Sequence, residues 1–187
     1  MLRLFPLLLV ACAGTIDGSP IPGDDVSTPD ASTVDESVAR AMEWVDVQLP
    51  YCQAPNHAHD NDADCSSTCT RPDNAEWDPY RSDCSGLVSW AWQLPPPGRT
   101  TMTFVPFDTE VTHVIPAAEL VPGDAVNNAH HMMLFAAWTI AGVEATFIDE
   151  PGCSSATPYA HQFTAKVTLD GNSITVEHHG TFTAIRH

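Results

Sequence analysis

The residue of this chain with the clearest capacity for chemistry is Cys84, in the run Asp83-Cys84-Ser85-Gly86-Leu87-Val88. Aspartate is a common helix N-cap, and the apolar residues that follow predict a mostly buried helix over 83–94. A thiol in the first turn of a helix lies where the backbone N–H groups and the helix dipole favour its thiolate. Cys84 is therefore a candidate nucleophile.

A base for this nucleophile is offered by two adjacent histidines, His130 and His131, which precede the apolar run 132–138. An imidazole beside a thiolate can stabilise it as an ion pair and then protonate a leaving amine. Because side chains alternate along a strand, only one of the two rings would face the cysteine.

Three segments together resemble the NlpC-type cell-wall cysteine peptidases. They are the Asp-Cys-Ser-Gly-Leu-Val run, Pro122-Gly123-Asp124, and His131 before an apolar strand. The similarity covers roughly residues 34–150. It implies a papain-like α+β fold and hydrolysis of amide bonds in peptidoglycan stem peptides, usually between D-glutamate and a diamino acid.

The same resemblance implies the roles of individual residues. Cys84 would be the nucleophile and His131, rather than His130, its base. Asp149 falls where the family has a polar residue that orients the imidazole, and Tyr51 resembles a tyrosine beside the nucleophile. The chain departs from the pattern in a Cys-containing acidic insertion at 52–82, and in Met132-Met133, which replace small residues and could narrow the groove.

The composition is strongly acidic. Among 187 residues, 7 are basic and 24 acidic, which gives a net charge of −17. Such a charge repels phosphate backbones and argues against a nucleic-acid partner. The length suits one domain, and we expect a monomer.

The N-terminus has the pattern of a lipoprotein signal. Residues 1–11 combine one arginine with a short apolar stretch, and Leu9-Val10-Ala11-Cys12 fits a lipobox with Cys12 as the lipidated residue. Residues 12–32 have the composition of a flexible tether. We therefore expect an exported protein anchored by lipid to a membrane of the bacterial envelope, at the outer membrane or facing the periplasm.

The remaining cysteines predict two disulfides, with three connectivities open. The four residues are Cys52, Cys65, Cys69 and Cys153. A zinc site that combines Cys65 and Cys69 with histidines is the weaker alternative, so no metal is expected there. We expect no required cofactor. Alternating aspartates in the acidic loop predict at most a weak calcium site, formed by Asp60, Asp62 and Asp64.

The order of elements predicts an α+β domain over 33–187, with N-terminal helices packed on an antiparallel β-sheet. A helix is expected over 34–48, a loop over 51–82 and the nucleophile helix after it. Strands are expected at 124–127, 131–138, 144–149, 165–169, 174–177 and 181–185, with a hairpin turn at 170–172.

Two other functions fit these residues. One keeps the papain-like fold but cleaves another amide, as an amidase or a toxin-like hydrolase. The other is a non-catalytic lipoprotein module that binds calcium through its acidic loop.

Overall fold

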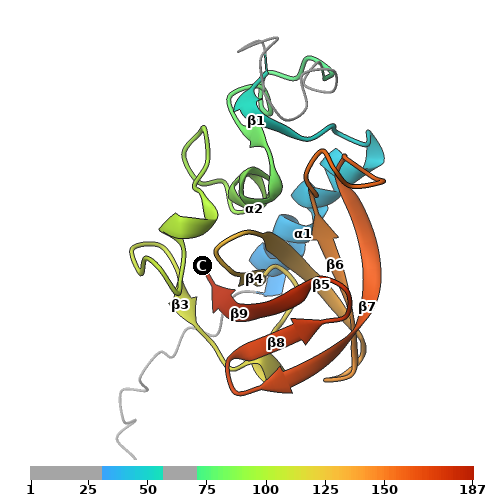
Figure 1. Cartoon of the computed structure of the whole chain (residues 1–187). Helices are drawn as coiled ribbons and strands as arrows, with labels where there is room; N and C mark the ends of the chain where they lie inside the picture. The colour runs from blue at the N-terminus through green and yellow to red at the C-terminus, as the bar shows by residue number, and fades with distance from the viewer. Residues whose placement is uncertain (1–30, 57–70) are drawn as a thin grey trace, which may run out of the picture.

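The described chain combines two helices with an antiparallel β-barrel, so the predicted α+β class is confirmed. The computed structural model describes residues 31–56 and 71–187. The helices are α1, Ala31–Asp46, and α2, Cys84–Ala91 (Figure 1). Two short 3-10 turns lie at Thr101–Thr103 and Ala117–Glu119.

Six strands form the barrel, in the order β9-β4-β5-β6-β7-β8, and the pairing of β8 with β9 closes it. Every neighbouring pair is antiparallel. A short strand, β3 (His113–Val114), adds to the outer edge of β9. The barrel strands are β4 (Ala125–Asn127), β5 (Met132–Ile140), β6 (Glu144–Asp149), β7 (His161–Asp170), β8 (Ser173–Val176) and β9 (Gly180–Arg186).

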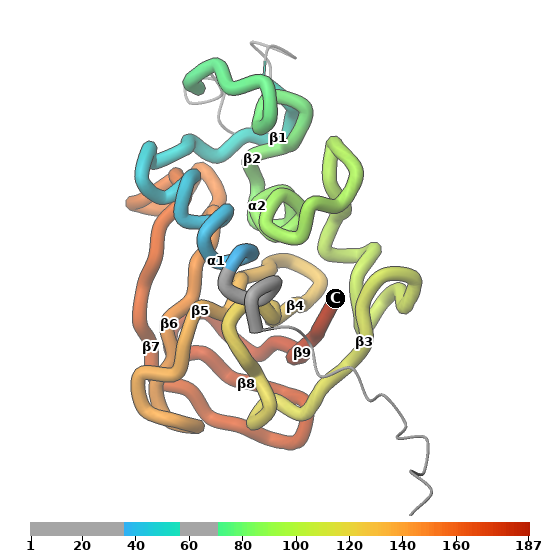
Figure 2. The backbone as a smooth tube through the Cα atoms, turned by 180° about the vertical axis from the view of Figure 1, so that it is seen from behind, coloured from blue at the N-terminus to red at the C-terminus, as the bar shows by residue number. Residues whose placement is uncertain are grey.

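The expected layer of N-terminal helices was wrong. The strands β1 (Cys52–Pro55) and β2 (Arg81–Ser82) form a separate antiparallel pair between α1 and α2 in the chain. Sequence periodicity missed this pair because two-residue and four-residue strands are too short to show alternation. The helices nevertheless lie against each other and against the barrel, α1 on β5, β6 and β7, and α2 on β5 (Figure 2).

The first five residues of β5, 132–136, are buried on both faces of the strand, which explains why all five are apolar. Met132, Leu134 and Ala136 face the core between helices and barrel, where they meet Trp44 and Leu87. Met133 and Phe135 point the other way, into the barrel interior with Phe147 and Phe182. Side-chain alternation along one strand thus joins the two cores. Neither Met132 nor Met133 reaches the surface, since both are 0 % exposed.

The predicted boundaries of most long elements lie close to the observed ones, but β7 begins at His161, four residues before the predicted start at 165. The helix expected at 34–48 runs from Ala31 to Asp46, and the second helix ends at Ala91 rather than at 94. The strand expected at 144–149 has those bounds. The hairpin turn follows Asp170 directly, and Gly171 takes the positive φ of 59° that such a turn requires.

Several predictions lie outside the described residues. These concern the signal segment 1–11, most of the tether 12–32, Cys12, Cys65, Cys69, and the calcium candidates Asp60, Asp62 and Asp64. Cys52 and Cys153 are both disulfide-bonded, and the pairing of the four cysteines stays a prediction. No helix in the described ranges has both the length and the apolar character needed to cross a membrane.

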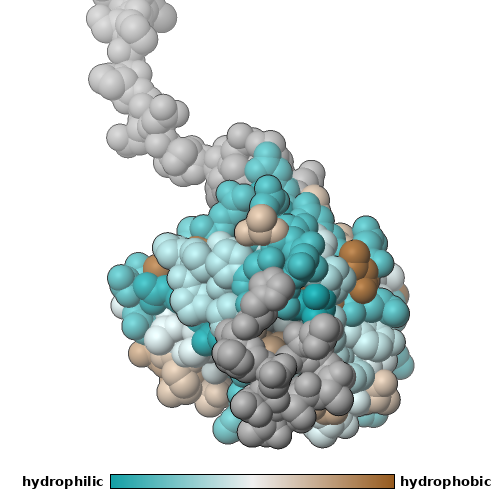
Figure 3. All heavy atoms as spheres, turned by 90° about the horizontal axis from the view of Figure 1, so that it is seen from above, coloured by the Kyte–Doolittle hydropathy of each residue, from teal (hydrophilic) through white to brown (hydrophobic). Residues whose placement is uncertain are grey.

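The described surface is mostly hydrophilic on the face shown in Figure 3, with hydrophobic residues in small separate groups. Large apolar side chains that are partly exposed are spread over several elements. They are Val47, Met102, Phe107, Val114, Val121, Ile140 and Val143.

Candidate active site

Cys84 is the first residue of α2 and a free thiol. Asp83 is the N-cap, and its Oδ1 accepts hydrogen bonds from the backbone N–H of Gly86 at 2.7 Å and from Ser85 Oγ at 3.0 Å. The first N–H groups of a helix have no partner within it, so the sulfur lies beside donors and the positive end of the dipole. The local sequence thus builds a thiol site from four consecutive residues.

Gly86 is required by a close approach of two backbone segments. A Cβ at this position would collide with the backbone carbonyl of Arg81. The guanidinium of Arg81 holds the same region, since its Nη2 donates to the carbonyl oxygen of Arg99 at 2.6 Å and its Nε lies 3.2 Å from Asp83 Oδ2. The start of α2 is therefore held in place by the Arg81 carbonyl, which packs against Gly86, and by the contacts of the Arg81 guanidinium.

The histidines lie in the turn between β4 and β5, and Asn128 organises that turn. Its Oδ1 accepts hydrogen bonds from the backbone N–H groups of His130 and His131, both at 2.9 Å. Its backbone N–H also donates to the carbonyl oxygen of His131 at 3.0 Å. The turn is tied to the loop after α2 through Thr101, whose Oγ1 donates to the Ala129 carbonyl. Sequence analysis overlooked Asn128, although an Asx residue before a turn is a recognisable signal.

His131 is held by Asp149. The ring Nε2 lies 2.8 Å from Asp149 Oδ2, and the carboxyl group is only 1 % exposed. Burial alone would lower the pKa of His131, but hydrogen bonding to Asp149 and to Cys84, with the charges of both, raises it to about 10. Since Nε2 is occupied by Asp149, Nδ1 is the ring nitrogen left for the sulfur. The ring is thus cationic at neutral pH and coupled to a thiol on one side and a carboxylate on the other.

A second histidine contacts the other oxygen of the same carboxyl group. His161 Nδ1 lies 3.1 Å from Asp149 Oδ1. Its ring stacks on Phe163, which in turn stacks on His179 with centroids 4.3 Å apart. Burial lowers the pKa of His179, as do the neighbouring histidines, while Asp149 opposes the shift. Sequence analysis did not find His161, because it is 30 residues from His131 and no motif joins them.

Glu150 is a buried carboxyl group directly beside this cluster. It is 0 % exposed, and neither side-chain oxygen has a hydrogen-bond partner among the described residues. Burial, together with the charges of Asp149, Asp83 and Cys84, raises its pKa well above the ordinary value, and Arg71 opposes this shift. Burial and the neighbouring negative charges therefore favour the protonated form of Glu150.

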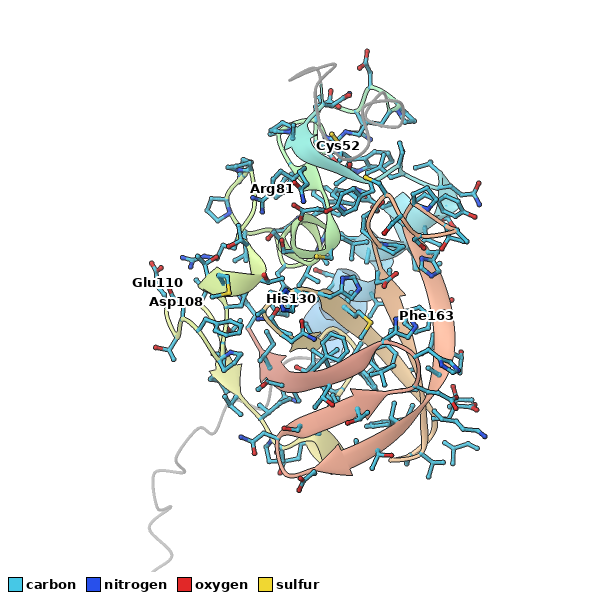
Figure 4. The ribbon with its side chains drawn as sticks, in the orientation of Figure 1. Cys52, Arg81, Asp108, Glu110, His130 and Phe163 are labelled. Atoms are coloured by element: carbon cyan, nitrogen blue, oxygen red, sulfur yellow. The ribbon has the colours of Figure 1, made fainter. Side chains whose placement is uncertain are left out.

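An open cleft of about 300 Å³ lies in front of Cys84. Tyr51 forms part of its wall, as the resemblance implied, and its hydroxyl accepts a hydrogen bond from Gln53 at 2.8 Å. His130 also lines the cleft, and Figure 4 shows it between α2 and the barrel. The remaining lining residues are Gln53, Arg81, Asp83, Ser85, Thr100 and Thr101.

The structure therefore brings Cys84, His131 and Asp149 together, with Tyr51 at the same cleft. The aspartate of Pro122-Gly123-Asp124 has a structural place instead. Asp124 is buried, and Arg186 near the end of β9 binds both of its carboxylate oxygens, at 2.7 and 2.8 Å. Among the described residues, no group of three or more His, Cys, Asp or Glu side chains is arranged to hold a metal ion.

Comparisons of this chain with protein-family models, with curated proteins and with solved structures found no match.

Proposed function

We propose that this protein is an exported cysteine hydrolase that cleaves amide bonds in peptidoglycan stem peptides, with a papain-like fold of the NlpC type. The observation that carries the proposal is the buried Asp149–His131 pair beside a free thiol at a helix N-terminus. A structural histidine needs neither a buried carboxylate partner nor a thiol neighbour. A thiolate–imidazolium pair needs the thiol neighbour, and a polar partner such as a carboxylate orients its imidazole.

In the proposed reaction, the Cys84 thiolate attacks the carbonyl carbon of the amide. The backbone N–H of Cys84, and the Tyr51 hydroxyl, donate hydrogen bonds to the oxyanion that develops. The His131 imidazolium then gives its Nδ1 proton to the leaving amine, and the C–N bond breaks to leave a thioester. His131, now neutral, takes a proton from water, which attacks the thioester and releases the acid and the thiolate.

The substrate proposal is supported by the cleft and by the motif together. The cleft is open, polar and about 300 Å³ in volume, which suits a short peptide rather than an apolar ligand. The Asp-Cys-Ser-Gly-Leu-Val run and the histidine before an apolar strand carry the resemblance to cell-wall peptidases. The lipid anchor at Cys12, the two disulfides and a location in the bacterial envelope belong to the same proposal.

The experiment is a digest of defined muropeptides with purified protein, followed by mass spectrometry of the fragments. We expect cleavage by the wild type and none by Cys84→Ala. His131→Ala should lose activity to the same extent, whereas His130→Ala is the matched control because its ring lines the cleft without contacting Asp149 in any described interaction.

Retained cleavage in Cys84→Ala would contradict the mechanism. Cleavage of other amides but of no muropeptide would leave the thiol mechanism standing and contradict the peptidoglycan assignment. An inactive wild type whose thiol is no more reactive than free cysteine would contradict both.

A further inference from the structure

The carboxyl group of Asp149 is shared between two histidines from different strands. His131 at the start of β5 contacts Oδ2 at 2.8 Å, and His161 at the start of β7 contacts Oδ1 at 3.1 Å. Neither His161 Nδ1 nor Asp149 Oδ1 has a hydrogen-bond partner among the described residues, and their 3.1 Å separation is an ion-pair contact. Two buried polar atoms without other partners therefore face each other.

Strand pairing and ring stacking fix the position of His161. Asp149 and His161 are directly paired in the β6–β7 register, so their side chains leave the sheet on the same face. The imidazole stacks on Phe163, whose centroid is 5.5 Å away, and Phe163 also packs against Phe147 of the barrel interior. Figure 4 labels Phe163 on the β7 side of the molecule. The ring is thus anchored in the barrel wall.

We infer that His161 is a positioning residue, whose ring is held in ion-pair contact with Asp149 Oδ1 and so keeps Oδ2 directed at His131. This inference rests on the proposed thiolate–imidazolium pair and extends it to a fourth side chain. A buried carboxylate with only one partner can rotate or take up a proton, and in either case the imidazolium loses its anchor.

Other ionisable groups lie close to this carboxyl group. Glu150, the residue after Asp149, is buried, and its pKa is raised by burial and by the charges of Asp149, Asp83 and Cys84. On the other side, His179 has a lowered pKa and lies beside Phe163 rather than on the carboxylate. Among the described residues, His131 and His161 are the ion-pair contacts of Asp149.

The test measures the rate at which iodoacetamide alkylates Cys84 between pH 5 and pH 10, which needs no substrate. We expect His161→Leu to slow alkylation about tenfold at pH 6, because Asp149 loses one of its two ion-pair contacts. The difference should disappear near pH 10, where an ordinary thiol ionises without help. A merely structural defect would change the rate at every pH.

Two further variants make the test specific. His161→Asn keeps a donor near the position of Nδ1, so it should restore most of the alkylation rate at pH 6. His179→Leu removes the outer ring of the stack but no contact to Asp149, so it should leave the pH profile unchanged. An unchanged profile in His161→Leu, or equal losses in His161→Leu and His179→Leu, would overturn the inference.

Muropeptide cleavage separates this inference from the proposed function. If His161→Leu changes alkylation as expected but the wild type cleaves no muropeptide, the positioning role stands and the substrate assignment fails. If the wild type cleaves muropeptides and His161→Leu behaves as the wild type in both assays, the function stands and the positioning role fails.

Discussion

The two sides of the site are built by different means. On the helix side, residues 81–89, the sulfur is positioned by neighbours in sequence, since Asp83 caps the helix that Cys84 begins and Gly86 admits the carbonyl of Arg81. On the barrel side, residues 128–161, the base is positioned by segments far apart in the chain, because His131 directly precedes β5, Asp149 ends β6 and His161 begins β7.

The two sides therefore make different contributions to the site. The helix side determines where the nucleophile lies, through local backbone geometry and close packing. The barrel side determines the charge on the imidazole, through a carboxyl group buried among strands. Apart from Cys84 itself, substitutions on the helix side should therefore act mainly on stability, and substitutions on the barrel side mainly on reactivity and its pH dependence.

The largest effect is expected from Asp149→Asn on the barrel side. Loss of the carboxylate charge should lower the turnover of muropeptides roughly 10³–10⁴-fold, as carboxylate-to-amide changes do in hydrolase triads. Asp83→Asn is the matched control on the helix side, because asparagine also caps helices well, and its turnover should fall less than about tenfold. Initial rates on a defined muropeptide measure both, and equal losses would remove the distinction between the two sides.

The pH dependence of stability is expected to come next in size. The pKa of His131 is about 10 in the folded protein, above its ordinary 6.5. The stabilisation from its protonation is therefore complete below pH 6.5 and is lost as the pH rises through 10. This contribution amounts to at most about 5 kcal/mol at 1.36 kcal/mol per pKa unit. Urea unfolding of wild type and His131→Gln measures it.

The two unfolding curves should converge as the pH rises from 6.5 to 10, because only the wild type loses this contribution. His131→Gln keeps Glu150 and the other buried groups, so that the change in the difference between the curves reports on His131. A constant difference across this range would show that the barrel side does not hold a charged imidazole.

The smallest of the three effects is expected from Gly86→Ala on the helix side. The added methyl group would meet the Arg81 carbonyl, and overpacking of this kind typically destabilises by about 1–3 kcal/mol. Gly152→Ala is the control, because a Cβ there meets no atom within 4 Å and should change stability by less than about 0.5 kcal/mol. Urea midpoints measure both, and equal stability of the two variants would contradict the close approach at the helix start.

The long elements could be predicted from the sequence because their signals are local. The strand at 144–149 follows from the alternation of its side chains along the chain. The turn before Ser173 follows from Gly171, which takes a positive φ. Barrel closure could not be predicted, since the pairing of β8 with β9 depends on register between strands rather than on the residues of either one. The pair β1–β2 was missed because its strands are too short to show a pattern.

The features of the candidate site can be divided in the same way, into those that the sequence determines and those that depend on tertiary structure. The amino-acid sequence alone marked Cys84 as a thiol at a helix start. The N-cap Asp83, Cys84 and Gly86 lie within four consecutive residues, and the local conformation of such a segment depends on those residues themselves. Only the tertiary structure decided that Asp149 meets His131, that His161 meets the same carboxyl group, and that Glu150 is buried without a partner. These contacts depend on strand register and on exclusion of water, and both arise only when segments far apart in the chain pack together.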